Sequence, residues 1–220
     1  MLEKKINELK KEIIFYSNHV LDMVHNSLRG LIDKDEHILK KLIKEDEEKA
    51  NEWELKLDEM CLTTIAQFGP KAKNLRLIIM VLKMNNDLER MADHAVNIAE
   101  SGLYLIDKPP VKKLIDIPLM EKETSGMLKD AIQSFVNEDD KLAEDIIKRD
   151  DIVDNLQEQI LRELITYMFD NPNTINRSLH LSRISHNFER IADLSTNIAE
   201  DVIFLKRGET VKHWREDDEK

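Results

Sequence analysis

An internal repeat of sixteen residues constrains the fold of this chain more than any other feature of its sequence. Residues 85–100 read NNDLERMADHAVNIAE, and residues 185–200, one hundred positions later, read SHNFERIADLSTNIAE. Eight of the sixteen positions are identical, whereas about one match would be expected by chance for ordinary amino-acid usage. Because a repeat of this length indicates a duplicated structural unit, we predict two halves built on one plan, with the same polar residues in each.

Composition and periodicity indicate that both halves are helical. Aromatic residues make up only 5% of the chain, and its five prolines and five glycines fall mostly between the segments that have helical periodicity. Those segments lie at residues 2–29, 35–68, 71–106, 118–135, 139–169 and 174–206. The prediction is an all-α fold of two tandem, pseudo-symmetric three-helix bundles, with six long antiparallel helices.

The two predicted bundles meet at Lys108-Pro109-Pro110, which interrupts the helical pattern. We therefore expect an N-terminal bundle at residues 1–108 and a C-terminal bundle at residues 109–220. Gly69-Pro70 and Asn171-Pro172-Asn173 occupy equivalent turns, and short turns make neighbouring helices run antiparallel. Gly208 is expected to end the last helix, and the charged segment 215–220 is expected to fray.

Charge and cysteine content exclude several classes of protein. The formal net charge of −11 disfavours nucleic acid as a partner, because phosphate binding needs a concentrated basic face. The single cysteine, Cys61, excludes an intramolecular disulfide and a cysteine-based zinc site, and we expect it in the core. The N-terminus is charged throughout, and the longest purely apolar run, 77–82, is too short to cross a bilayer. We expect a cytoplasmic protein that is peripheral to a membrane only through its partners.

Acidic residues form a ladder inside each copy of the repeat. Glu89 and Asp93 are four residues apart and therefore lie on one face of their helix, at the edge of the core stripe. Like charges at this spacing cost about 0.2–0.5 kcal/mol per pair, and a bound cation would remove that cost. Carboxylates from adjacent helices suit hard or borderline metals. The candidate metal ligands are Glu47, Glu89, Asp93, Asp150, Asp154, Glu189 and Asp193, with Asn97, Asn197, Glu100 and Glu200 as further candidates.

The residues alone also allow two roles for the ladder besides simple metal binding. It can be a solvated or partner-facing stripe, whose acids are partly neutralised when Arg90 and Arg190 pair with Asp93 and Asp193 three residues away. It can also belong to a metal-dependent enzyme, but nothing in the sequence singles out a general base for one. Against a simple stripe, both copies retain Glu, Asp, Asn and Glu together while neighbouring positions have diverged.

Other residues of the repeat predict interfaces rather than chemistry. The paired apolar positions Met91/Ile191 and Ile98/Ile198 fall away from the core stripe, which predicts a second buried surface between bundles or between subunits, and we expect a homodimer. His94 corresponds to Leu194, which is typical of a surface or interface residue. The chain has no pair of Glu-x-x-His helices, no glycine-rich phosphate loop and no nucleophile elbow. We therefore expect no enzymatic activity.

The duplicated motif makes the chain similar to the PhoU family of phosphate-transport regulators. The resemblance lies in LERMADHAVNIAE at 88–100 and FERIADLSTNIAE at 188–200, and extends to EEKAN at 47–51, GPKAKNLR at 69–76 and DDIVD at 150–154. It implies two related three-helix bundles that hold iron or zinc clusters at their ExxxD-type motifs. Asn51 stands where the second half has Asp154, so the resemblance implies one carboxylate fewer at the N-terminal site.

The resemblance also implies a function without catalytic turnover. Members of this family connect a phosphate ABC transporter, through its ATPase subunit, to a membrane sensor histidine kinase. They repress the phosphate-starvation response when phosphate is plentiful. The alternative is a metal-free helical interaction module that accompanies another phosphate transporter.

Overall fold

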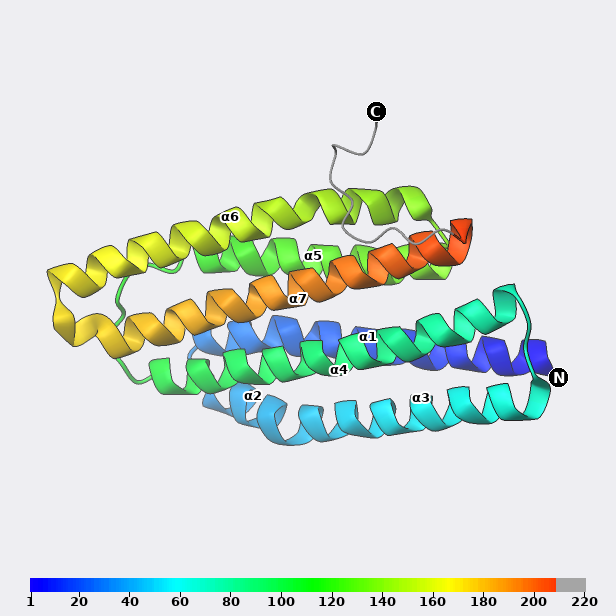
Figure 1. The fold of residues 1–220 in the computed structure, drawn as a ribbon. Coiled ribbons are helices and arrows are strands. Elements are labelled where there is room, and N and C mark those ends of the chain that lie inside the picture. The colour runs from blue at the N-terminus through cyan, green and yellow to red at the C-terminus, as the bar shows by residue number, and fades with distance from the viewer. Residues whose placement is uncertain (209–220) are drawn as a thin grey trace, which may run out of the picture.

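The computed structural model of the protein describes residues 1–208 and confirms the all-α, two-bundle fold. Figure 1 shows the two bundles side by side, each made of three long helical rods that run antiparallel. No strand occurs among residues 1–208. The elements are α1 (Leu2–Ile32), α2 (Glu36–Lys41), the π-helical turn η1 (Leu42–Asp46), α3 (Glu47–Phe68), α4 (Lys73–Leu105), α5 (Asp116–Asn137), α6 (Asp140–Asp170), the 3-10 turn η2 (Pro172–Thr174) and α7 (Ile175–Arg207).

The second rod of the N-terminal bundle contains a π-helical turn that periodicity did not reveal. The rod is capped at its start by Asp35, whose side chain accepts hydrogen bonds from the backbone N–H groups of His37 and Ile38 at 2.9 and 3.1 Å. At η1 the carbonyl of Asp46 lies 2.8 Å from His19 Nε2 on α1. Inserted π turns are frequent at functional sites, and this one places Glu47 at the first position of α3.

Helix ends agree with the predicted segments to within a few residues. Gly208 ends α7 in the left-handed conformation, with φ of 74°, as predicted for a C-terminal stop. The linker predicted at Lys108-Pro109-Pro110 lies between α4 and α5. The predicted start of α5 at Pro118 was wrong, because the helix begins at Asp116 and proline is tolerated within a first turn. The predicted fraying of 215–220 lies outside the described residues.

The third helix of each bundle joins the two bundles together. α4 packs against α7 (Figure 1), and Met91, Ile98, Ile191 and Ile198 are completely buried. These are the apolar positions that fall away from the core stripe, so the second buried surface lies between the bundles. Buried side chains of both bundles form one continuous cluster.

Two ion pairs frame this interface in a pseudo-twofold arrangement. Arg183 of α7 pairs with Glu100 of α4 at 3.3 Å, and Lys83 of α4 pairs with Asp201 of α7 at 2.5 Å. The two cations stand one hundred residues apart, so each occupies the same place in its own repeat. The duplicated helix therefore packs antiparallel on its own copy and pairs with it at both ends.

No helix in the described part of the chain is both long and apolar enough to cross a membrane.

The packing of α4 on α7 predicts that one buried isoleucine stabilises both bundles. Ile98→Ala should lower the free energy of unfolding by about 2–5 kcal/mol, because it leaves a cavity in the shared core. Ile79 lies on the same helix with 41% of its surface exposed, so Ile79→Ala should change stability by only about 0.5 kcal/mol. Urea denaturation measures both. Equal effects of the two substitutions would contradict the assignment of the interface.

Candidate metal centres

Four carboxylates on α6 and α7 of the C-terminal bundle lie close enough for their charges to act on one another. Asp150 and Asp154 lie one turn apart on α6, and Glu189 and Asp193 lie one turn apart on α7. The pKa of Asp150 is raised to about 7, first by burial and then by the charges of Asp193, Asp154 and Glu189. The pKa of Asp154 is also raised, first by burial and then by the charge of Asp193. The four predicted residues of this half therefore act on one another as a single acidic group.

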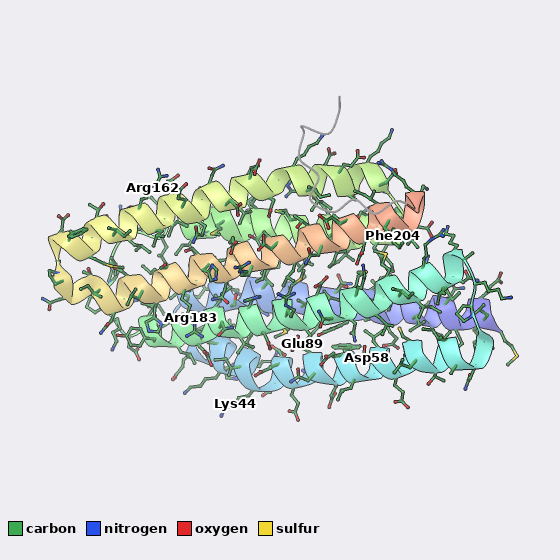
Figure 2. All side chains as sticks on the ribbon, in the orientation of Figure 1. Lys44, Asp58, Glu89, Arg162, Arg183 and Phe204 are labelled. Atoms are coloured by element: carbon green, nitrogen blue, oxygen red, sulfur yellow. The ribbon has the colours of Figure 1, made fainter. Side chains whose placement is uncertain are left out.

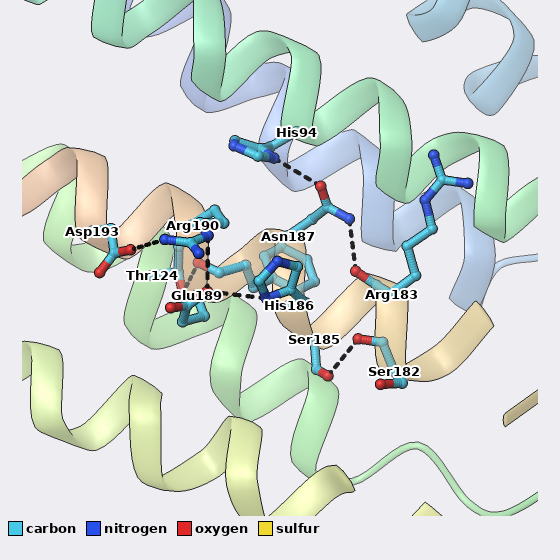
Figure 3. Close-up of polar contacts among 11 residues, drawn as sticks. His94, Thr124, Ser182, Arg183, Ser185, His186, Asn187, Glu189, Arg190 and Asp193 are labelled. Atoms are coloured by element: carbon cyan, nitrogen blue, oxygen red, sulfur yellow. Dashed lines mark hydrogen bonds and ion pairs between the residues drawn. The ribbon is translucent and has the colours of Figure 1, made fainter. Parts of the chain in front are cut away.

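Glu189 of this C-terminal acid group has a buried carboxylate oxygen without a hydrogen bond in the described part of the chain. Its Oε2 atom is buried and has no hydrogen-bond partner among residues 1–208. It lies within ion-pairing distance of His186 Nδ1 at 3.3 Å and Arg190 Nε at 3.6 Å, as Figure 3 shows, but neither contact has hydrogen-bond geometry. Burial and the charge of Asp193 raise the pKa of Glu189, whereas Arg190 opposes that rise. A buried carboxylate oxygen without a donor is a position where a cation would be stabilised.

The predicted pairing of arginines with the acids is confirmed in one half and wrong in the other. Arg190 donates to Asp193 Oδ2 at 2.9 Å, as predicted. Arg90, its counterpart, lies 3.8 Å from Asp87. Asp87 is 8% exposed, and the corresponding position in the second repeat is the uncharged Asn187. The extra carboxylate in the first repeat therefore draws Arg90 toward the N-terminal end of the motif and away from Asp93.

The N-terminal bundle has an equivalent acid group between α3 and α4. Burial raises the pKa of Glu47, followed by the charges of Asp93 and Glu100. Burial likewise raises the pKa of Glu89, followed by the charges of Asp93 and Glu54. Glu89 is labelled in Figure 2, where it lies on α4 beside α3. The predicted residues Glu47, Glu89 and Asp93 are thus brought into one electrostatic group.

Two residues of this N-terminal acid group were missed by the sequence prediction. Glu54 is half-buried on α3, and its charge acts on Glu89. Tyr16 of α1 is completely buried, and its hydroxyl has no hydrogen-bond partner among residues 1–208. Burial raises the pKa of Tyr16, and so do the charges of Glu54, Glu89 and Asp93. A comparison of Glu54 with Gln157, 103 residues later, could have identified the acid, whereas periodicity marks Tyr16 only as a core residue.

The further candidates Asn97 and Glu100 contact the other bundle. Arg183 of α7 donates hydrogen bonds to Asn97 Oδ1 and to Glu100 Oε2. Their counterparts on α7 are the exposed Asn197 and the half-buried Glu200. Asn97 and Glu100 of the predicted N-terminal ladder thus help to hold α4 against α7. The charge of Glu100 nevertheless acts on Glu47.

His94 is an interface residue, one of the two roles expected for it. Its Nδ1 atom lies 2.8 Å from Asn187 Oδ1 on α7 and donates to it, because the amide nitrogen of Asn187 donates to the carbonyl of Arg183 at 2.7 Å. Figure 3 shows this chain of contacts between the bundles. Burial lowers the pKa of His94. The histidine thus stabilises the contact between α4 and α7 in its neutral form.

The two acid groups have suitable donors for a metal, but the donors are not in ligating positions. Carboxylates on neighbouring helices are appropriate ligands for iron, zinc and other divalent cations. The buried, donor-free Glu189 Oε2 also fits a cation. Nevertheless, no group of three or more His, Cys, Asp or Glu side chains within residues 1–208 is arranged closely enough to hold a metal ion. Metal binding would require carboxylates to change rotamer and approach one another.

Comparisons with known proteins agree with the duplicated fold. A family model described as the PhoU domain matches the chain twice, at residues 13–102 and 117–202. The chain is 36% identical to a phosphate-specific transport system accessory protein PhoU homolog of Aquifex aeolicus, over 212 residues that cover 96% of each protein. It is 31% identical to PhoU homolog 2 of Thermotoga maritima, over 99% of this chain and 92% of that protein.

Solved structures share the same arrangement. The crystal structure of PhoU from Pseudomonas aeruginosa matches with a TM-score of 0.91 and 30% identity, and the match covers 95% of this chain and 100% of that chain. The phosphate transport system regulatory protein PhoU from Streptococcus pneumoniae matches with a TM-score of 0.90 and 25% identity, over 96% of this chain and 100% of that one.

The raised pKa of Asp150 predicts how the metal-free protein responds to pH. The folded protein holds a proton on Asp150 up to a pH of about 7, whereas an unfolded aspartate loses it near pH 4. The folded state therefore binds more protons between these values, and stability should fall as pH rises from about 4 to 7. Asp150→Asn should weaken this dependence, while the other acids with raised pKa values keep part of it. It should stabilise the metal-free protein at pH 7.5 by about 1–3 kcal/mol, because one pKa unit corresponds to about 1.4 kcal/mol and solvent screens a partly buried group.

Urea denaturation in the presence of EDTA at pH 4.5, 6 and 7.5 measures this effect. Asp145→Asn is the matched control, because Asp145 is exposed on the same helix. A parent protein whose stability rises steadily over this range, with Asp150→Asn no more stable than Asp145→Asn, would contradict the convergence of the C-terminal acids.

Proposed function

The chain belongs to the PhoU family, and from this membership we propose that it is a regulatory accessory protein of a phosphate transport system, with metal bound at its two acid groups. We further propose that the protein represses the phosphate-starvation response when phosphate is plentiful. The accessory role is supported by the match of both bundles, over almost the whole chain, to proteins named as accessory or regulatory components of phosphate transport.

The proposed metal sites are supported by the effect that carboxylates on adjacent helices have on one another's pKa values in both bundles. In the C-terminal bundle Asp150, Asp154, Glu189 and Asp193 would hold the metal, and in the N-terminal bundle Glu47, Glu89 and Asp93 would do so. A bound iron or zinc ion would supply positive charge to groups whose pKa values are raised by burial and then by mutual repulsion. Because each acid group spans two helices, this charge would hold those helices in one relative position.

The proposed partners are the ATPase subunit of a phosphate ABC transporter and a sensor histidine kinase. We place the protein in the cytoplasm, at the membrane only through these partners, and propose that it forms a homodimer. Exposed apolar side chains support an interaction surface on α3, where Leu55 and Leu62 lie two turns apart with 71% and 63% of their surfaces exposed. No catalytic step is assigned to the chain, and the relatives are named as accessory or regulatory proteins.

One observation favours a second candidate, a metal-free helical module that accompanies another phosphate transporter. Within the described residues, the acids do not form a ligand set as they stand, and Arg190 already neutralises part of the C-terminal group. In this case the acids would contact basic surfaces of partner proteins, and binding would weaken as salt screens those charges.

Elemental analysis distinguishes the two candidates. The metal-binding account predicts that protein purified without a histidine tag or chelator retains iron or zinc. Substitution of Glu89, Asp93, Glu189 and Asp193 by their amides should remove most of that metal while keeping the side-chain volumes. The pair Glu48→Gln and Glu52→Gln is the matched control, because both residues are exposed on α3 at the same spacing of four. Equal metal in parent and amide variant would contradict these sites, and no metal in either would favour the metal-free module.

Deletion of the gene in its own host tests the regulatory role. We expect phosphate-starvation genes to be expressed at high phosphate, because the repressing signal is lost. The parent chain should restore repression, and so should the Glu48/Glu52 control. The amide variant of the four acids should restore it only in part, if metal orders the signalling surface. Unchanged expression after deletion would contradict the regulatory role, whatever the metal content.

A further inference from the structure

A cavity of about 430 Å³ lies where the two bundles and their linker meet. Its walls come from the ends of α1 and α4, the linker, the first turn of α5, and α7. Small-molecule sites usually have volumes of about 300–1,000 Å³ and occur preferentially at such junctions. Most of the lining is apolar, including Leu31, Leu105, Ile106, Val111, Leu114 and Leu181.

The charge of the lining is opposite to that of the protein. Within residues 1–208, every charged side chain that lines the cavity is a lysine, namely Lys34, Lys108 and Lys112. In the whole chain, 44 acidic residues outnumber 33 basic ones. Lys34 and Lys108 are exposed and form no ion pair with a described residue. Cations just beyond a helix C-terminus are stabilised by the helix dipole, which accounts for each lysine singly but not for the apolar cavity that they share.

The linker that forms one wall is held in place from two sides. Lys112 is buried and donates hydrogen bonds to Asp116 at 2.8 Å and to Glu163 of α6, so its charge is already neutralised. Arg177 of α7 donates to the backbone carbonyl of Pro109, where the linker passes α7 in Figure 1. Two consecutive prolines restrict the same segment. The cavity is therefore preformed, and a ligand would not have to order its walls.

The equivalent corner of the C-terminal bundle is closed by ion pairs. The turns after α1 and α5 correspond at an offset of 104, and each ends in an aspartate that caps the next helix. Lys34 and Glu138 occupy the same place in these turns, with φ of 52° and 50°. Glu138 pairs with Lys73 at 2.5 Å and with Lys10 at 3.5 Å. One corner of the duplicated fold is thus neutralised internally, whereas Lys34 leaves a positive charge at the other.

We propose that this cavity binds a small amphipathic carboxylate of the fatty-acid class, with its alkyl chain against the apolar walls and its carboxylate paired with Lys34 and Lys108. A monoanion fits better than a polyanion, because the walls are mainly apolar and the third lysine is already paired. The ligand would contact both bundles and the linker at once. This inference goes beyond the proposed function and depends on neither metal binding nor gene repression.

Isothermal titration calorimetry with decanoate, below its micelle concentration and with EDTA present, tests the proposal on the full chain. We expect saturable binding of one decanoate per chain. Octanoate should bind about tenfold more weakly, because two fewer methylene groups are buried. Decyltrimethylammonium has the same chain length but the opposite charge, and should bind more weakly than decanoate. Absence of decanoate binding, or tighter binding of the cation, would overturn the proposal.

Charge removal at the rim tests the role of the lysines. Lys34→Gln combined with Lys108→Gln should raise the Kd for decanoate by about 3–10-fold, because exposed ion pairs are individually weak. The matched control is Lys113→Gln combined with Lys129→Gln, which removes the same charge from exposed positions outside the cavity. The Kd of this control should equal that of the parent. An equal Kd in both double variants would overturn the assignment of the carboxylate to Lys34 and Lys108.

Two further substitutions locate the alkyl chain. Leu114→Trp should abolish decanoate binding, because the larger side chain fills the cavity from the linker. Ile32 lines the rim with 50% of its surface exposed, so Ile32→Glu should keep the fold and weaken binding by charge repulsion, whereas Ile32→Gln should weaken it less. Melting temperatures check that each variant is folded. An unchanged Kd for Ile32→Glu would overturn this site even if Leu114→Trp failed to fold, and it would leave the proposed function untouched.

Discussion

The antiparallel packing of α4 on α7 is the contact on which the rest of the structure depends. Each of these helices is the third helix of its bundle and buries one stripe of side chains in its own core. Each also buries a second stripe, represented by Ile98 and Ile198, against the duplicated helix of the other bundle. Because the interface joins two copies of one sequence, it has pseudo-twofold symmetry, and its end contacts by Lys83 and Arg183 repeat at the same interval as the motif.

This double burial limits where the acids of the repeat can lie. A helix that gives two stripes to apolar contacts retains only a narrow polar arc. At about 100° per residue, Glu89 and Asp93 fall on the side of the core stripe away from Ile98. That edge faces the second helix of the same bundle, so the acids meet carboxylates of α3 and α6 instead of open solvent. Partial burial and like charge then raise their pKa values, which favours protonation or the binding of a cation.

Much of this arrangement could be predicted from the sequence because it follows from periodicity and duplication. The six long helical rods, the turn at Gly69-Pro70 and the second apolar surface at Met91 and Ile98 are all consequences of spacing. The π-helical turn at 42–46 could not be predicted, because one extra residue in a turn leaves the neighbouring apolar spacing almost unchanged.

The side-chain contacts between helices could not be predicted from the sequence either. The contact of Arg183 with Asn97 and Glu100 depends on how the bundles dock, and Arg90 turns to Asp87 because that carboxylate is buried beside it. Glu54 could have been found by aligning the two halves at the offset of 103. Asp154 aligns with Asn51, and Glu54 lies only three residues after Asn51, less than one helical turn away. Tyr16 could not have been found, because its pattern is that of an ordinary core residue and only its unpaired hydroxyl distinguishes it.

Location of bound metal by anomalous X-ray diffraction tests the central claim that acids at the edges of the two bundles form metal sites. Crystals grown with Zn²⁺ and measured on both sides of the zinc absorption edge would place each ion directly. The account predicts anomalous peaks at two separate positions, one between α3 and α4 near Glu89 and one between α6 and α7 near Glu189. Peaks elsewhere, or none at either acid group in crystals of the unmodified chain, would contradict it.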